Sequence, residues 1–195
     1  MRALTMICVV FLSGISQAAE LTGKPVPDKV RKVLVEILDS AGAPSAEVTS
    51  VERTTTEQAT IMFDYYLKQG ASNCASKKSC SCETFEGRVL CAKGFYCEIG
   101  DKAIETVLSS DARDQAIAKM KTFFDENLKP DRACLMHVVT NPPPMNFAVD
   151  IAPSSIHGFE EAFVKAVEAN GSVDKKRFFR PGKSEETAYH IEIPR

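Results

Sequence analysis

Two short stretches decide the fold prediction: residues 147–153, FAVDIAP, and residues 189–193, YHIEI. In each stretch, β-branched and apolar residues surround a polar side chain, which is the pattern of a half-buried strand. Successive side chains of a strand point to opposite faces of its sheet, so Asp150 and His190 project away from their apolar neighbours. Two such strands, paired in one sheet, would bring together a carboxylate and an imidazole, and zinc binds both. We therefore expect a sheet that carries a pair of metal ligands.

The first 18 residues have the composition of a secretory signal peptide. Arg2 precedes a short apolar run over residues 4–12, and residues 16–18 (SQA) supply the small side chains of a cleavage site. The run is too short for a membrane span. We expect cleavage after Ala18, which leaves residues 19–195 as one periplasmic or secreted domain with no membrane segment; an uncleaved anchor is the alternative.

Charges of both signs are mixed along the chain. The formal net charge is −2, and loss of Arg2, the one charged residue among the first 18, takes it to −3. Because the sequence has no basic patch, we expect no nucleic-acid partner. It makes no prediction about an oligomer.

Six cysteines follow residue 18, and an even count in an exported chain predicts disulfides. Five of them fall within 24 residues, which predicts a disulfide-rich insertion at about residues 71–100. A zinc cluster is the alternative, but the spacing lacks the paired C-x2-C knuckles of structural zinc sites. The sixth is expected to join the cysteine-rich segment to the main sheet. The predicted disulfide residues are Cys74, Cys80, Cys82, Cys91, Cys97 and Cys134.

Hydrophobic periodicity and capping residues predict an α+β domain, with a small antiparallel sheet flanked by helices. A helix capped by Asp28 should end at Gly42, and a capping box at residues 54–57 (TTTE) should open a second helix that ends at Gly70. Further helices are expected at residues 101–109, 112–128 and 158–169. Strands are expected at residues 46–52, 134–140, 146–151, 175–179 and 187–193, and a hairpin turn at residues 86–87.

The order of three motifs resembles that of the zinc D-Ala-D-Ala carboxypeptidase and L-alanyl-D-glutamate endopeptidase family, which shares its α+β core with the Hedgehog signalling domain. The motifs are residues 48–54 (VTSVERT), 148–151 (AVDI) and 189–193 (YHIEI). The resemblance spans about residues 28–70 and 134–193. It implies that Arg53 contacts the substrate, that Asp150 and His190 bind zinc, and that the substrate is a peptidoglycan stem peptide or another cell-wall peptide.

The chain departs from the family pattern at two positions. The family's Ser-x-His-x6-Asp motif places its histidine ligand at Pro143, and its Glu-x-x-His motif places the catalytic base at Thr187. Neither residue type suits its role. The strict pattern therefore lacks one ligand and the base.

Two other residues are candidates for these roles. If residues 134–140 and 146–151 pair as antiparallel strands around a lengthened proline turn, a one-residue register change places His137 opposite Asp150. His137 is thus the expected third metal ligand. Glu186 lies four residues before His190 and is the expected catalytic base, provided that a bulge or turn brings it back toward the metal.

Each candidate also has a purely structural alternative. His137 can be a hydrogen-bonded core histidine, Asp150 can cap the turn at residues 154–155, and Arg53 can be a solvated residue before a helix. His157, before the helix expected at residues 158–169, is the alternative candidate for a metal ligand.

Three functions remain open at this level. The first is a zinc peptidase, in which the metal polarises the scissile carbonyl and Arg53 holds the substrate. The second is a non-catalytic relative that binds peptidoglycan peptides or another exported protein. The third is a disulfide-stapled binding or inhibitor protein. Asp150 and His190 favour the first, and the misplaced base favours the other two.

Overall fold

The computed structural model describes residues 18–76, 82–85, 88–91, 98–107, 112–130, 135–183 and 187–195, and has the α+β architecture that the sequence predicts. The helices of these ranges are α1 (Asp28–Ala41), α2 (Thr55–Ser76), α3 (Glu98–Glu105), α4 (Arg113–Asn127) and α5 (Glu160–Ala169). The strands are β1 (Glu20–Gly23), β2 (Ser45–Ser50), β3 (Cys82–Phe85), β4 (Arg88–Cys91), β5 (Asn146–Ile151) and β6 (Tyr189–Pro194).

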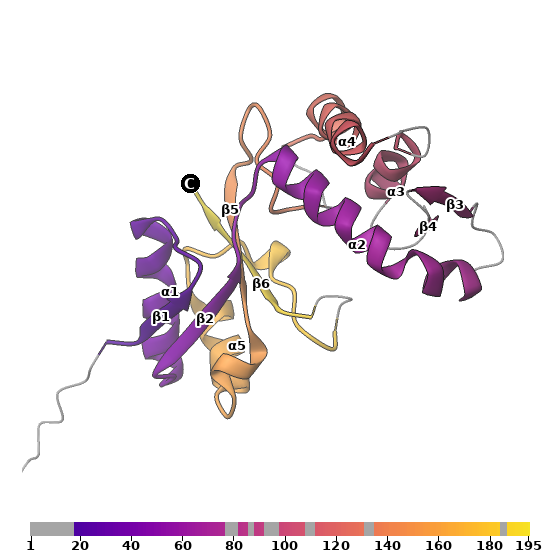
Figure 1. Ribbon diagram of the computed structural model, residues 1–195. Coiled ribbons are helices and arrows are strands. Elements are labelled where there is room, and N and C mark those ends of the chain that lie inside the picture. The colour runs from indigo at the N-terminus through magenta and orange to yellow at the C-terminus, as the bar shows by residue number, and fades with distance from the viewer. Residues whose placement is uncertain are drawn as a thin grey trace, which may run out of the picture.

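The main sheet has four strands in the order β1-β2-β5-β6 (Figure 1). β2, β5 and β6 pair antiparallel, but β1 pairs parallel to β2, so the prediction of an antiparallel sheet was wrong at this edge. β1 was not predicted, because it is short and directly follows the predicted signal peptide. β1 ends at Gly23, where φ is +82° and a Cβ atom would lie 2.3 Å from the Val48 carbonyl oxygen, so the chain needs glycine there.

One hydrophobic core lies between the apolar face of the sheet and the helices α1 and α5. The predicted apolar positions of α1 are buried, and Gly42 ends the helix in the left-handed conformation, with φ of +69°. The predicted cap was wrong: Pro27 precedes the helix, and Asp28 is its first residue. From the sheet, Val149 and Ile191 enter this core fully buried.

A second core joins α2, α3 and α4. α2 opens with the predicted capping box: the Thr54 N–H donates to Glu57 Oε2 at 2.7 Å, and the Glu57 N–H donates to Thr54 Oγ1 at 3.1 Å. The helix does not end at Gly70, as predicted, but continues to Ser76. In Figure 1, α2 runs from the sheet to the part of the molecule that contains α3, α4 and the β3–β4 hairpin.

The predicted inward face of α2 was half right. Met62 and Tyr66 are buried, whereas Ile61 and Tyr65 are exposed.

Two predicted strands are not strands. Residues 134–140 were expected to pair with β5, but their described part forms turns, with an isolated bridge between Val138 and Arg53 and a positive φ at Leu135. Residues 175–179 contain a short 3-10 helix, Lys175–Arg177, and one bridge from Phe179 to His190. The hairpin predicted around residues 86–87 is confirmed by the antiparallel pairing of β3 and β4.

Several predictions fall outside the described residues. They are the signal peptide, the base Glu186 and the cysteines Cys80, Cys97 and Cys134. Backbone pairing sets Cys82 opposite Cys91, but the described side chains do not include those of Cys74, Cys82 and Cys91, so the disulfides stay a prediction.

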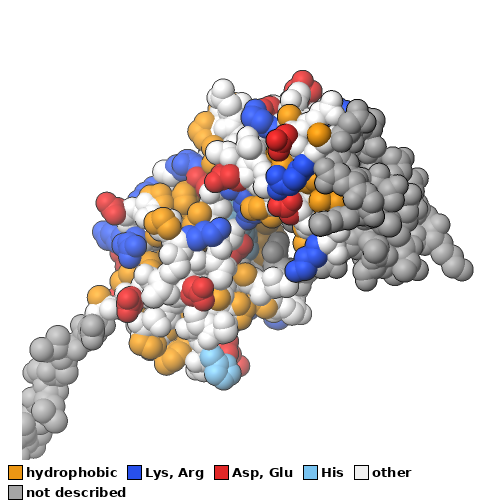
Figure 2. All heavy atoms as spheres, in the orientation of Figure 1, with side chains coloured by type: hydrophobic (Ala, Val, Ile, Leu, Met, Phe, Trp, Pro, Cys, Tyr) orange, Lys and Arg blue, Asp and Glu red, His pale blue; other side chains and the backbone are white. Residues whose placement is uncertain are grey.

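Within the described ranges, none of the helices combines the length and apolar character that crossing a bilayer requires. Acidic and basic side chains are interspersed over the face shown in Figure 2.

Candidate metal centre

Asp150 and His190 are direct neighbours across the sheet. β5 and β6 pair antiparallel with Asp150 opposite His190, and the alternation along β6 sends Ile191 into the core and His190 to the other face. The apolar partners on the core face hold this register, since a slip of one residue would turn every side chain to the opposite face. The core thus fixes the pairing of the two polar residues.

His137 reaches the same place by a route that the sequence analysis did not foresee. The predicted hairpin with β5 is absent from the described chain, where β5 pairs with β2 and β6 instead. Backbone hydrogen bonds join the loop before β5 to Arg53, the residue that precedes the capping box of α2. The Arg53 N–H donates to the His137 carbonyl at 2.8 Å, and the Val139 N–H donates to the Arg53 carbonyl at 2.9 Å. Val138, between them, is buried in the helical core.

The side chains of His137, Asp150 and His190, here called the His/Asp triad, meet around one point. Asp150 Oδ1 lies 2.9 Å from His190 Nδ1 and 3.0 Å from His137 Nε2, and the two ring nitrogens are 3.2 Å apart. Ligands of a tetrahedral zinc site with bonds near 2.0 Å are about 3.3 Å from one another. The triad therefore has the ligand types and nearly the spacing of three corners of such a site, and this group can hold a metal ion.

Burial and charge both act on the triad. Burial by itself raises the pKa of Asp150, but hydrogen bonds from His137 and His190 outweigh it and hold that pKa well below its usual range. Burial by itself lowers the pKa of His190, but the hydrogen bond to Asp150 and the nearby Glu192 carboxylate outweigh it and raise the pKa to about 9. Asp150 is thus ionised at neutral pH, as a metal ligand must be.

The triad lines a cavity of about 190 Å³ together with Arg53 and Gln58. The guanidinium of Arg53 donates to Ser50 Oγ at 2.6 Å, and Ser50 stands next to Asp150 in the β2–β5 pairing. Among the described residues, no carboxylate lies within ion-pair distance of Arg53. The predicted substrate contact therefore shares a cavity with the candidate metal ligands, and its charge is available to an anionic group.

One residue beside the triad was missed. Glu192 follows His190 by two positions on the same face of β6, and its side chain is buried. Its carboxylate accepts from Asn146 Nδ2 at 2.9 Å and from Arg177 Nη1 at 3.2 Å, and it lies 3.6 Å from His190 Nε2. The signal was present in YHIEI, because residues two apart in a strand share a face.

The remaining histidine is elsewhere. His157 is exposed, pairs with Glu160 at 3.1 Å and is not part of the metal-ligand group, so the alternative that it substitutes as a ligand was wrong.

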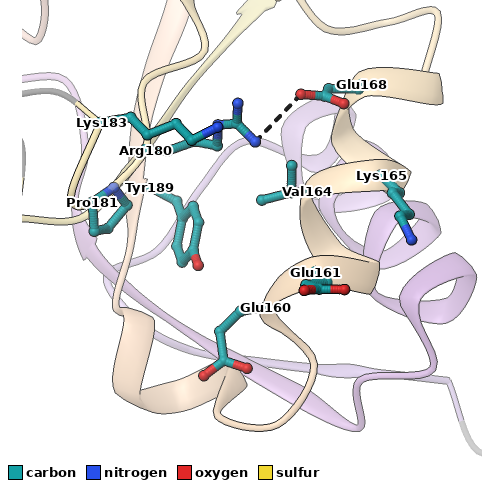
Figure 3. Close-up of a pocket in the computed structure, with 9 residues that line it drawn as sticks. All are labelled: Glu160, Glu161, Val164, Lys165, Glu168, Arg180, Pro181, Lys183 and Tyr189. Atoms are coloured by element: carbon teal, nitrogen blue, oxygen red, sulfur yellow. Dashed lines mark ion pairs between the residues drawn. The ribbon is translucent and has the colours of Figure 1, made fainter.

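A different hollow lies between α5 and the loop before β6 (Figure 3). Its lining includes Val164, Tyr189 and the ion pair between Arg180 and Glu168, at 3.6 Å. Tyr189 precedes His190 and packs into the core face of the sheet, so this hollow and the triad lie on opposite faces.

Comparison of the chain with family models, with curated proteins and with solved structures finds no match.

Proposed function

We propose that this protein is an exported zinc peptidase of the DD-peptidase type that acts on peptidoglycan stem peptides. The observation that carries the proposal is the His/Asp triad, which brings two imidazoles and a carboxylate within 3.2 Å of one another in the cavity that Arg53 also lines. A two-histidine, one-carboxylate set with an open side is the ligand pattern of catalytic zinc. The motif order that resembles the DD-peptidase family supports the choice of substrate.

Each residue has a defined role in this proposal. His137, Asp150 and His190 would hold zinc, which when bound supplies Lewis acidity for polarising a peptide carbonyl and for activating water. Arg53 binds a carboxylate of the peptide, a role for which its forked guanidinium and its free charge suit it. Glu186, one residue before the position of the family's base, would accept the proton of the attacking water during hydrolysis.

A second function is supported by one observation. Of the described residues that line the cavity, Asp150 is the one carboxylate, and it belongs to the triad. A protein without a base near its metal would bind cell-wall peptides, or another exported protein, without cutting them. This non-catalytic binding function, including a disulfide-stapled inhibitor, is the alternative.

Metal content tests the zinc site directly. The purified protein should contain about one zinc per chain by mass spectrometry of the metal. His137→Ala and His190→Ala should each lose it. The third histidine offers a matched control, because His157→Ala removes an exposed imidazole that pairs with Glu160 and lies outside the metal-ligand group, and it should leave the zinc in place. A wild-type protein that takes up no zinc at neutral pH would refute the site.

Product release separates the two functions. Wall fragments incubated with the zinc-loaded protein should release D-Ala or shortened stem peptides, and Glu186→Gln should stop the release while zinc remains bound. Binding of the same fragments without release by the wild type would leave the non-catalytic function. Absence of both binding and release would reject cell-wall peptides as the ligand.

A further inference from the structure

We infer that Glu192 is a positioning residue, which orients His190 so that Nδ1 faces the metal while Nε2 carries the ring proton. The inference rests on the zinc site of the proposed function and gives a role to a residue that lies outside the triad and has no assigned role in the family motifs.

The two nitrogens of the His190 ring have different surroundings. Nδ1 lies 2.9 Å from Asp150 Oδ1 and 3.2 Å from His137 Nε2, so it belongs to the triad. Nε2 is buried on the other side of the ring, and Glu192 Oε1 is 3.6 Å away, within ion-pair range and slightly beyond hydrogen-bond distance. The ring therefore lies between two carboxylates, one on the metal side and one behind it.

Glu192 is itself held in place. A buried carboxylate is costly unless other groups satisfy it, and here two side chains do so. Asn146 Nδ2 donates to Oε2 at 2.9 Å, and Arg177 Nη1 donates to Oε1 at 3.2 Å. Asn146 Nδ2 also donates to Asp174 Oδ2 at 3.0 Å, and the Asp174 N–H donates to the Glu192 carbonyl at 2.9 Å. These bonds hold the Glu192 carboxylate in place without help from a metal.

The register between β5 and β6 also places Glu192 relative to the metal ligands. Ala148 is the cross-strand partner of Glu192, as Asp150 is of His190. The metal ligands and the positioning carboxylate thus occupy successive cross-strand pairs on one face of the sheet. The register that sets Asp150 opposite His190 also sets Glu192 behind the ring.

The chemical consequence concerns the tautomer of the ring. A neutral imidazole carries one proton and offers one lone pair. When a metal takes the lone pair of Nδ1, where the triad converges, the ring proton lies on Nε2, which faces the Glu192 carboxylate. Outer carboxylates of this kind orient metal-bound histidines and raise their basicity, and their loss weakens metal binding by about tenfold to a hundredfold.

The test compares two carboxylate-to-amide changes, each beside a histidine. Glu192→Gln keeps the shape of the side chain and removes its charge, and it should weaken zinc binding by about tenfold or more, measured by competition with a chromophoric chelator. Glu160→Gln makes the same change beside exposed His157 and should leave zinc affinity unchanged. If Glu192→Gln is folded by circular dichroism and binds zinc within about threefold of the wild-type affinity, the inference is overturned.

A measurement on the wild-type protein removes any dependence on the folding of the variant. Long-range proton–nitrogen NMR of the zinc-loaded protein should show the His190 proton on Nε2 and no proton on Nδ1. A proton on Nδ1 would overturn the inference even where the zinc site exists. A wild-type protein that binds no zinc would overturn both the inference and the proposed function, whereas zinc binding without peptide hydrolysis would leave the inference standing.

Discussion

Raising the pH should strengthen zinc binding and lower the free energy of unfolding of the metal-free protein. The reason is that the His190 ring carries its second proton, and so a positive charge, when no metal is bound. Burial opposes the charged ring, but the hydrogen bond to Asp150 and the Glu192 carboxylate outweigh burial and raise the pKa of His190 from 6.5 to about 9. Zinc binds an unprotonated ring nitrogen. Binding near neutral pH must therefore displace this proton.

The size of the effect follows from the shift of the pKa. The folded-state value lies about 2.5 units above the ordinary one, and at 1.36 kcal/mol per unit the protonated ring contributes about 3 kcal/mol to the metal-free fold. Because the folded pKa is raised, this stabilisation is fully present below pH 6.5 and is lost as the pH rises through about 9. Over the same window, zinc affinity should increase about tenfold per pH unit, since one proton leaves as the metal binds.

Two titrations measure the opposite trends. Denaturant unfolding in the presence of a chelator gives the free energy of unfolding of the metal-free protein at each pH, and chelator competition gives the zinc affinity. His157→Ala should show both trends unchanged. A zinc affinity that stays constant between neutral pH and about pH 9 would contradict a raised pKa of His190, since a histidine of ordinary pKa would already be neutral there.

Three other changes have defined outcomes. Arg53→Gln should leave zinc content unchanged and raise the KM for a stem peptide by about tenfold to a hundredfold, because a charge-assisted hydrogen bond is worth about 1.5–3 kcal/mol; an unchanged KM in steady-state assays would exclude the proposed contact. Thr54→Ala should cost about 1 kcal/mol in denaturant unfolding through loss of the capping box, and exposed Thr56→Ala, its control, should cost less. Phe163→Ala should lower the free energy of unfolding by about 3–5 kcal/mol because Phe163 is buried in the sheet core, and a loss below about 1 kcal/mol would contradict that packing.

Local signals in the sequence were sufficient for the elements whose ends and faces are set by nearby residues. α1 follows from its apolar spacing and Gly42, and the start of α2 follows from the capping box, whose two hydrogen bonds are both present. β5 and β6 follow from their alternation. None of these predictions needed knowledge of distant partners.

The other elements depend on partners that are far away in sequence. Residues 134–140 are apolar enough for a strand, but the backbones of His137 and Val139 bond to Arg53 rather than to β5, and Leu135 adopts φ of +54°. β1 forms a strand because it pairs with the edge of β2, and the four residues of β1 alone do not indicate that partner. Tertiary contacts decided both cases.

The candidate site divides in the same way. The pairing of Asp150 with His190 was predictable, since alternation and a shared sheet are enough to bring the two side chains together. The position of His137 beside Asp150 and His190 was predicted, but for the wrong reason. His137 lies close to them because backbone hydrogen bonds join its loop to Arg53, not because the loop pairs with β5 as a hairpin. Glu192 was overlooked because the family motifs assign no role to the second residue after the histidine.

Arg53 takes part both in holding a metal ligand and in the proposed contact with the substrate. Its backbone N–H and carbonyl hold His137 and Val139, while its side chain lines the cavity and bonds to Ser50. Because both ties to the loop are made by backbone atoms, they survive replacement of the side chain. Arg53→Gln therefore removes the substrate contact and leaves the loop that carries His137 in place, whereas Arg53→Pro would also remove the N–H donor. The glutamine variant should keep its zinc and the proline variant should lose it. Equal zinc loss in both would mean that the guanidinium, and not the backbone, holds the third ligand.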